Sequence, residues 1–183
     1  MIDSLGQYIH KIKPLGVIDC TLSKRNIGTN KDMAPITIAV GPGHKAGIDV
    51  DIVVESKRGH DLGKVIFNGP AASNTGIPGD ILGYREERII RAIKSGIIKW
   101  NYQIGDLIEK DAVVGTILDA EIKAQISGVI RGLIKEGLYV DEGLKIGDID
   151  PRGIQEYAST ISDKARAIGG GVLEALMYVK NKL

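Results

Sequence analysis

The stretch RAIKSGIIKWNYQIGDLIEKDAVVGTI, residues Arg91–Ile117, decides the fold because a second copy of its pattern follows it. The stretch KAQISGVIRGLIKEGLYVDEGLKIGDI, residues Lys123–Ile149, aligns with it without a gap, and glycines coincide at Gly96 and Gly128. Each copy alternates short β-branched segments with glycines, which predicts three short strands joined by tight turns. Because a repeated unit of this kind packs against its own copy, we expect two halves of one β module.

The repeat resembles the half-motif of biotinyl and lipoyl domains, whose two halves pair around a pseudo-twofold axis. The resemblance covers about Glu87–Asp150 and implies a barrel-sandwich hybrid. Such carriers hold their modified lysine at the tip of a hairpin between the halves. Here the link Leu118–Ile122 is shorter and contains no lysine, and Lys123 already begins the second copy. We therefore expect no carrier lysine and no covalently attached biotin or lipoate.

The whole chain is expected to be an α+β protein that is mainly β. It divides into an N-terminal β-rich region with a short helix at 1–86, the barrel-sandwich module at 87–150, and a C-terminal helical segment packed on the rest at 151–183. In the first region, the β-branched run Ile36–Val40 predicts a strand. The runs Val50–Glu55 and Lys64–Asn68 predict a hairpin, and Asp3–Lys13 has the spacing of a short amphipathic helix.

Composition argues against several classes of function. Lysine and arginine number 24 against 23 acidic residues, so a net charge of +1 gives no basic excess for nucleic acid or an anionic membrane. No apolar stretch approaches the length of a membrane span. The single cysteine, Cys20, permits no internal disulfide. We expect a cytoplasmic protein without nucleic-acid or membrane partners.

The C-terminal segment combines a helix signal with a run of glycines. Thr160–Asp163 has the spacing of a capping box, with aspartate in place of glutamate, and apolar residues then recur at helical spacing. The run Gly169–Gly171 interrupts this pattern, and each helical glycine costs roughly 1 kcal/mol relative to alanine. Either another backbone packs closely against the glycines, or the helix breaks and offers N–H groups to a ligand. In both cases we expect Gly170→Ala to clash.

Two further segments offer candidate chemistry. Gly41-Pro42-Gly43 follows a predicted strand and forms either a tight turn or a nest of backbone N–H groups for an anion. Asp148 and Asp150 lie two residues apart on one strand, with Arg152 just beyond. Such an arginine staples a strand to a loop, or one of the carboxylates serves as a general base.

We expect an anion site where these segments converge with the C-terminal helix. Its predicted residues are Gly41, Gly43, Asp150, Arg152, Lys164, Arg166, Gly169, Gly170 and Gly171, with Arg58, His60 and Asn74 as secondary candidates. For Lys164 and Arg166 the alternative is a solvated pair of charges. The histidines have no short mutual spacing and Cys20 belongs to no Cys/His cluster, so no metal site is expected. No residue is assigned as catalytic.

Longer motifs follow one another in a specific order: GPGHKAGIDVD at Gly41–Asp51, ESKRGHDLGKVI at Glu55–Ile66, GLKIGDIDPRG at Gly143–Gly153 and TISDKARAIGGGVLEAL at Thr160–Leu176. Together they are similar to the C-terminal portion of the YqeB-type proteins, accessory proteins of the selenium-dependent molybdenum hydroxylase system. The resemblance covers about Gly16–Leu176. It implies a longer protein with a nucleotide-binding-like domain ahead of this region, so we expect this chain to be a fragment or a split version.

The resemblance implies an accessory or maturation role and leaves the reaction open. We expect a non-catalytic or weakly catalytic protein that binds a client hydroxylase or a small anionic ligand, such as a molybdenum-cofactor fragment. One alternative is an enzyme acting on a molybdenum-cofactor-related ligand, with Asp148 or Asp150 as base. Another is a structural assembly module without a ligand. Convergence of the three segments on one pocket favours a ligand, and their separation favours the assembly module. A homo-oligomer is a further expectation.

Overall fold

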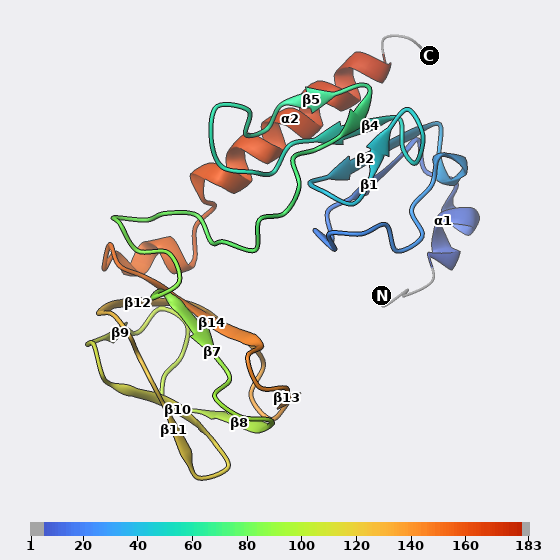
Figure 1. Ribbon diagram of the computed structural model, residues 1–183. Coiled ribbons are helices and arrows are strands. Elements are labelled where there is room, and N and C mark those ends of the chain that lie inside the picture. Colours follow the sequence, from blue (N-terminus) through green and yellow to red (C-terminus); the bar gives the residue numbers. More distant parts are fainter. Residues whose placement is uncertain (1–5, 181–183) are drawn as a thin grey trace. The chain divides into compact units, whose positions relative to one another are not determined.

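The computed structural model describes residues 6–180 and divides the chain into two compact units (Figure 1). Unit 1 consists of Met1–Thr75 and Ser162–Leu183, and unit 2 consists of Gly76–Ile161. The elements are mainly strands with one long C-terminal helix, which confirms the predicted α+β class. Of the helix expected at Asp3–Lys13, the structure shows α1 at Gln7–Ile12, and residues 3–5 lie outside the described part. No helix in residues 6–180 has the length and apolarity needed to cross a bilayer.

Unit 1 is built on a four-stranded sheet in the order β1-β2-β4-β5. Its strands are β1 (Gly16–Asp19), β2 (Ile36–Val40), β4 (Ile52–Val54) and β5 (Val65–Ile66). Strands β1, β2 and β4 run parallel, and β5 returns antiparallel to β4, which confirms the predicted strand and hairpin. Smaller elements are β3 (Lys45–Ala46) paired with β6 (Gly69–Pro70), and a 3-10 turn η1 (Lys31–Met33).

One helix, α2 (Asp163–Lys180), covers one face of this sheet, as Figure 1 shows. The β-branched side chains of Ile36, Ile38 and Val40 point to that face and pack with the helix. The helix contributes Ala175, which is fully buried, and a stripe made of Ile168, Val172, Leu176 and Val179. The intervening residue Ala39 packs on the other face with the β3–β6 pair. Strand β2 is therefore buried on both faces, which explains why four of its five residues are apolar and all five are buried.

Helix α2 begins two residues later than the capping-box spacing suggests. Asp163 is its first residue, and the Ser162 hydroxyl accepts a hydrogen bond from the Ala165 N–H at 3.1 Å. Thr160 instead donates its hydroxyl to the Glu156 carbonyl in the preceding turn. The prediction of Thr160 as the cap is therefore wrong, because serine at 162 satisfies a free helical N–H just as well.

The glycine run does not break the helix. Helix α2 is continuous through Gly169–Gly171, so the alternative with exposed N–H groups is wrong. A Cβ at Gly171 would lie 2.0 Å from the carbonyl oxygen of Gly63, because the loop between β4 and β5 crosses the helix there. A Cβ at Gly170 would meet nothing within 4 Å. The glycine in close contact with another backbone is therefore Gly171. The prediction that Gly170→Ala would clash is wrong.

Unit 2 contains two four-stranded sheets, ordered β11-β10-β8-β13 and β7-β14-β12-β9. The first copy of the repeat supplies β7 (Ile89–Arg91), β8 (Gly96–Trp100), β9 (Leu107–Ile108) and β10 (Val113–Ile117). The second copy supplies β11 (Ala120–Lys123), β12 (Gly128–Leu133), β13 (Tyr139–Val140) and β14 (Lys145–Asp150), and a 3-10 turn η2 (Gln155–Ala158) follows. The copies therefore match strand for strand, and the repeat begins earlier than the sequence alignment shows.

The two copies exchange their short strands. Ile108 of β9 pairs with Gly128 of the second copy, and Val140 of β13 pairs with Gly96 of the first copy. Both glycines adopt nearly the same backbone angle, with φ of 156° at Gly96 and 158° at Gly128. One shared core of isoleucines, valines and alanines lies between the sheets. This interlocked pair of half-repeats confirms the barrel-sandwich hybrid.

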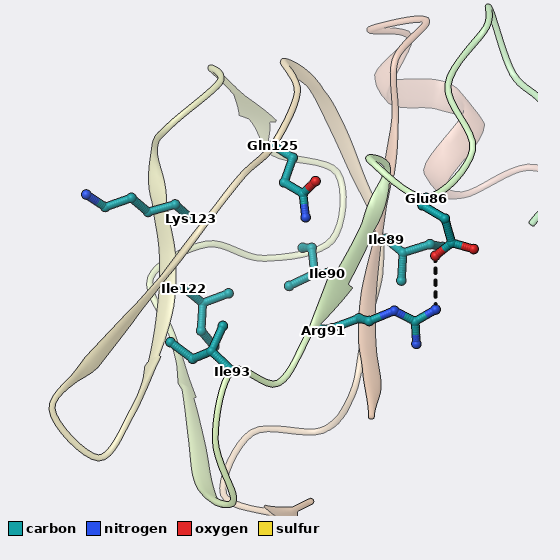
Figure 2. Close-up of a pocket in the computed structure, with 8 residues that line it drawn as sticks. All are labelled: Glu86, Ile89, Ile90, Arg91, Ile93, Ile122, Lys123 and Gln125. Atoms are coloured by element: carbon teal, nitrogen blue, oxygen red, sulfur yellow. Dashed lines mark hydrogen bonds and ion pairs between the residues drawn. The ribbon is translucent and has the colours of Figure 1, made fainter. Parts of the chain in front are cut away.

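The hairpin between the copies is short. Ile117 of β10 pairs directly with Ala120 of β11, which leaves only Leu118 and Asp119 in the turn. Lys123, which is labelled in Figure 2, lies at the far end of β11 and forms an exposed ion pair with Glu121. We expect the intact mass of the purified protein to equal that of the 19.6 kDa polypeptide. A biotinyl or lipoyl adduct on Lys123 or Lys110 in that mass spectrum would contradict the argument from the short hairpin.

Candidate ligand site at the carboxyl edge of unit 1

Buried polar residues gather where the parallel strands of unit 1 end. Because β1, β2 and β4 run in the same direction, their carboxyl ends lie along one edge of the sheet. Asp19 ends β1, His44 follows β2 by a four-residue turn, and Glu55 and Ser56 follow β4. Each of these four residues is at most 7% exposed. Ligands of open sheets commonly bind at this edge, so we take it as the candidate site.

Asp19 organises the loop that follows β1. One carboxylate oxygen accepts hydrogen bonds from the N–H and hydroxyl of Thr21, and the other accepts one from the Thr29 hydroxyl at 2.6 Å. Burial acts to raise the pKa of Asp19, but the hydrogen bonds from Thr29 and Thr21 outweigh it and hold the pKa below its ordinary value. Burial and the Asp19 charge both raise the pKa of the neighbouring Cys20 thiol, so this cysteine is a poor nucleophile.

His44 is a buried histidine at this edge whose ring nitrogens are not satisfied by hydrogen bonds. Its side chain is 3% exposed, and neither ring nitrogen has a hydrogen-bond partner within the described residues. Its Nε2 lies 3.5 Å from the Asp19 carboxylate, which is too long for a well-formed hydrogen bond. An unsatisfied buried polar group costs about 1–3 kcal/mol, so a fold seldom keeps one without a use for it.

Glu55 and Ser56 form the next part of the edge. The Glu55 carboxylate accepts hydrogen bonds from the backbone N–H groups of Ser56, Lys57 and Ala72, each at 2.7 Å. The Ser56 hydroxyl makes no hydrogen bond to other described residues. A Cβ at Gly41 would lie 2.6 Å from that hydroxyl oxygen, and Gly41 has a φ of 79°. Glycine at 41 therefore serves both the left-handed turn and the room for Ser56.

Cations surround the edge. A Cβ at Gly43 would lie within 3 Å of the backbone of Lys24 and Arg25, so that basic loop passes directly over the Gly41–His44 turn. Arg58 follows three residues after Glu55 and binds the first residue of α2, Asp163, with its second guanidinium nitrogen at 2.9 Å. Lys164 lies beside Arg58 and Glu55.

Lys164 is a half-buried cation that forms no ion pair with another described residue. Its side chain is half-buried, and no hydrogen bond or ion pair in the described part of the chain includes its ammonium group. Burial and then the Arg58 charge lower the pKa of Lys164, and the Glu55 charge only partly opposes them. The protonated form of Lys164 is therefore destabilised, and an anion bound beside it would stabilise that form.

The structure assigns the predicted site residues to different units. Gly41, Gly43, Lys164, Arg166, Gly169, Gly170 and Gly171, and the secondary candidates Arg58, His60 and Asn74, belong to unit 1, whereas Asp150 and Arg152 belong to unit 2. Within unit 1, Gly41, Gly43 and Lys164 are at or near the candidate edge. The space beside Gly171 is instead filled by the Gly63 carbonyl, which leaves no room there for a ligand. His60 and Asn74 are exposed. The convergence of the segments from the two units stays a prediction.

Asp150 holds a strand to the segment that follows it. Its buried carboxylate, 1% exposed, accepts hydrogen bonds from the side chain of Arg152 at 2.6 and 2.8 Å and from Arg131 at 3.0 Å. Arg152 also stacks on the Tyr157 ring. The Arg152 hydrogen bond outweighs burial and lowers the pKa of Asp150. Asp148 in turn binds Arg88 at 2.7 Å. Because the lowered pKa makes Asp150 a weak base and Asp148 is engaged by Arg88, the geometry favours the staple over general-base catalysis.

The sequence did not reveal the residues at the centre of this edge. Asp19, Glu55 and Ser56 each follow a short β-branched run. That position was the feature of the sequence that could have identified them as site residues. It becomes informative only once the strands are known to be parallel. No group of three or more His, Cys, Asp or Glu side chains in residues 6–180 is arranged to hold a metal ion.

Comparison with known proteins gives one close relative. The chain is 50% identical over 182 residues to the uncharacterized protein YqeB of Escherichia coli (strain K12), a match that covers 100% of this chain and 34% of that protein. The chain thus spans about a third of that relative's length. The resemblance to YqeB-type proteins is confirmed by this match, which says nothing about a hydroxylase system. No protein-family model matches the chain.

Two solved structures show weaker likeness. An aspartoacylase family protein from Mesorhizobium loti is 20% identical, with 35% of this chain and 23% of that chain covered and a TM-score of 0.31. A succinylglutamatedesuccinylase/aspartoacylase from Rhodobacter sphaeroides is 15% identical, with 63% and 45% covered and a TM-score of 0.32. At TM-scores this low, neither likeness carries an argument.

Proposed function

We propose that this chain is part of an accessory or maturation protein of a selenium-dependent molybdenum hydroxylase system. In that role its unit 1 binds a small anionic ligand at the carboxyl edge. The observation that carries the ligand proposal is Lys164, a half-buried ammonium group that forms no ion pair and whose pKa burial and the Arg58 charge lower more than the Glu55 charge raises it. The ordered motifs from Gly41 to Leu176 support the biological setting.

The edge supplies the groups that an anion needs. Lys164 provides the charge, and Lys57 and Arg25 add cations to the surroundings. The Ser56 hydroxyl is available as a hydrogen-bond donor next to the glycine turn at Gly41. A phosphate-like or oxometalate group fits this chemistry, because its oxygens accept several hydrogen bonds at once. The client hydroxylase is the proposed protein partner.

We expect phosphate or molybdate to raise the melting temperature of the wild-type protein but not of Lys164→Met. A ligand present at ten times its Kd stabilises the folded state by about 1.4 kcal/mol. Without any anion, Lys164→Met should melt slightly higher than wild type, by up to about 0.5 kcal/mol, because a half-buried charge is removed. Differential scanning calorimetry with each anion measures both effects.

The sign of the pH dependence follows from the lowered pKa of Lys164. Between the folded pKa and the ordinary value of 10.5, the unfolded chain binds more protons than the folded one, so stability rises with pH across that window. An anion should reduce this rise because it favours the protonated lysine. Lys110→Met, at an exposed loop position of unit 2, is the matched control and should keep the wild-type anion response. The proposed site would be contradicted if anions raised the melting temperature of both variants equally, or if they did not raise that of the wild type.

A further inference from the structure

Strand β11 is the longest edge strand of unit 2, which lies wholly within the described residues. The strand orders place β11 and β13 at the edges of one sheet, and β7 and β9 at the edges of the other. Strand β11 has four residues, whereas β7 has three and β9 and β13 have two each. An edge strand carries a row of backbone N–H and C=O groups to which a further strand can bind.

The outward backbone groups of β11 belong to Glu121 and Lys123. Just beyond the strand, the Ala124 N–H donates to the Ala112 carbonyl at 2.9 Å, and the Ala124 carbonyl accepts from the Asp111 N–H at 2.8 Å. Ala124 therefore directs both groups inward. Because neighbouring residues of a strand alternate in this respect, Glu121 and Lys123 direct their groups away from β10. No backbone hydrogen bond in the described part of the chain uses them on that side.

The space beside this edge is open, as Figure 2 shows. A pocket of about 210 Å³ separates β11 from β7, and its lining includes Ile122 from β11 and Ile90 from β7. The Lys123 side chain points away from the other labelled residues, whereas Ile122 points toward Ile93. Glu121 and Lys123 thus share the outer face of the strand, 57% and 56% exposed, and Ile122 lies on the buried face.

Strand β7, the equivalent edge of the first copy, is partly covered by its own chain. The Ile89 N–H of this strand donates to the Glu86 carbonyl at 2.9 Å. Arg91, at the position equivalent to Lys123, binds the Glu86 carboxylate at 3.0 Å and the Gly143 carbonyl at 3.2 Å. Of these two edges related by the pseudo-twofold, β11 is the one that stays uncovered.

The sequence of the β11 edge is complementary to itself. In an antiparallel pair of two copies with Ile122 opposite Ile122, Glu121 of each copy lies opposite Lys123 of the other. Opposite charges directly across an antiparallel pair stabilise it, whereas like charges destabilise it. The same register suits the backbone, because the outward groups of Glu121 and Lys123 then form the hydrogen-bonded pairs. Charge and backbone therefore select one register and one occupant.

We propose that a second copy of this chain pairs with β11, strand against strand, and forms an isologous dimer about a twofold axis through Ile122. The four-stranded sheets of the two copies then join into one continuous sheet. Such a contact uses the same surface on both copies, as closed twofold symmetry requires. The dimer lies within unit 2 and does not depend on the anion site proposed for unit 1.

Sedimentation velocity of the full chain over a range of concentrations tests the proposal. The wild type should associate reversibly to a dimer. Glu121→Lys and Lys123→Glu should each weaken the dimer roughly tenfold at low salt, because like charges then lie opposite each other on both sides of the axis. Arg91→Glu, a charge reversal at the equivalent position of β7, is the matched control and should leave the dimer unchanged. Circular dichroism of the variants confirms that they fold.

Mixing the two single variants separates this register from other modes of association. Glu121→Lys makes the edge wholly basic and Lys123→Glu makes it wholly acidic, so an equimolar mixture should dimerise about as tightly as the wild type. The double variant exchanges both charges and should also dimerise. A wild type that stays monomeric at the highest soluble concentration leaves the edge to another occupant and overturns the proposal. So does a dimer that both single variants leave intact, or a mixture that associates no more tightly than either variant alone.

Discussion

Gly171→Ala is expected to destabilise unit 1 by about 3 kcal/mol, the upper end of the usual effect of overpacking. The new Cβ would lie 2.0 Å from the Gly63 carbonyl oxygen and 2.9 Å from a methyl group of Val54. Neither neighbour can give way easily. Gly63 is itself confined, because a Cβ there would lie 2.5 Å from the Ala167 carbonyl oxygen, and Val54 is fully buried. Thermal unfolding should show a loss of roughly 10–20 °C in melting temperature.

Gly170→Ala is the matched control, one residue away on the same helix. Nothing lies within 4 Å of the added methyl group, so alanine should stabilise the helix by up to about 1 kcal/mol. The two variants should therefore shift the melting temperature in opposite directions. Similar shifts in both would mean that the helix does not meet the Gly63 backbone as described.

Asp150→Ala is expected to destabilise unit 2 by about 3 kcal/mol, because it removes one partner of a buried charged cluster. Arg131 and Arg152 both bind this carboxylate, and their side chains are only 22% and 32% exposed. Urea unfolding monitored by the fluorescence of Trp100, which lies in unit 2, measures the change. Glu121→Ala, which breaks an exposed pair with Lys123, should change stability by no more than about 0.5 kcal/mol.

A second variant at this position, Asp150→Asn, should alter the acid stability of unit 2. The folded pKa of Asp150 lies below its ordinary value of 3.8. Its contribution is therefore fully present above pH 3.8 and is lost as the pH falls through the folded pKa. Asp150→Asn should flatten the stability profile in that acidic range while leaving the slope near neutral pH unchanged. A wild-type profile that Asp150→Asn leaves intact would show that the cluster is not charged as described.

Unit 2 could be predicted from the sequence because its fold is encoded twice. The matched glycines at Gly96 and Gly128 and the shared spacing pointed to two equal halves. The alignment of the repeat, however, began at Arg91 and so left out most of the first strand, although Ile90 and Ile122 are identical at the same offset. The strand pairing confirms that these two residues are equivalent, since Ile90 lies opposite Gly147 and Ile122 lies opposite Gly115.

Unit 1 was harder to predict because local patterns do not reveal strand order. The run Ile36–Val40 indicated a strand, but nothing near it showed that Gly16–Asp19 would pair alongside in parallel. The connection between these two strands contains no long helix, which is the usual signal of a parallel crossover. The candidate edge at Asp19, His44 and Glu55 depends on that order. The packing role of Gly171 was equally hidden, because its partner Gly63 is more than a hundred residues away in the chain.

The exchange of β9 and β13 between the half-repeats has a consequence for how unit 2 folds. The hairpin around Leu118 and Asp119 closes with a two-residue turn, so it joins neighbours in the chain and can form early. The exchanged pairs join Ile108 to Gly128 and Gly96 to Val140, across much longer loops. Neither half-repeat can complete a sheet before the other has supplied its strand. We therefore expect the shared core to close in one late cooperative step, whose speed depends on chain topology more than on the stability of any single strand.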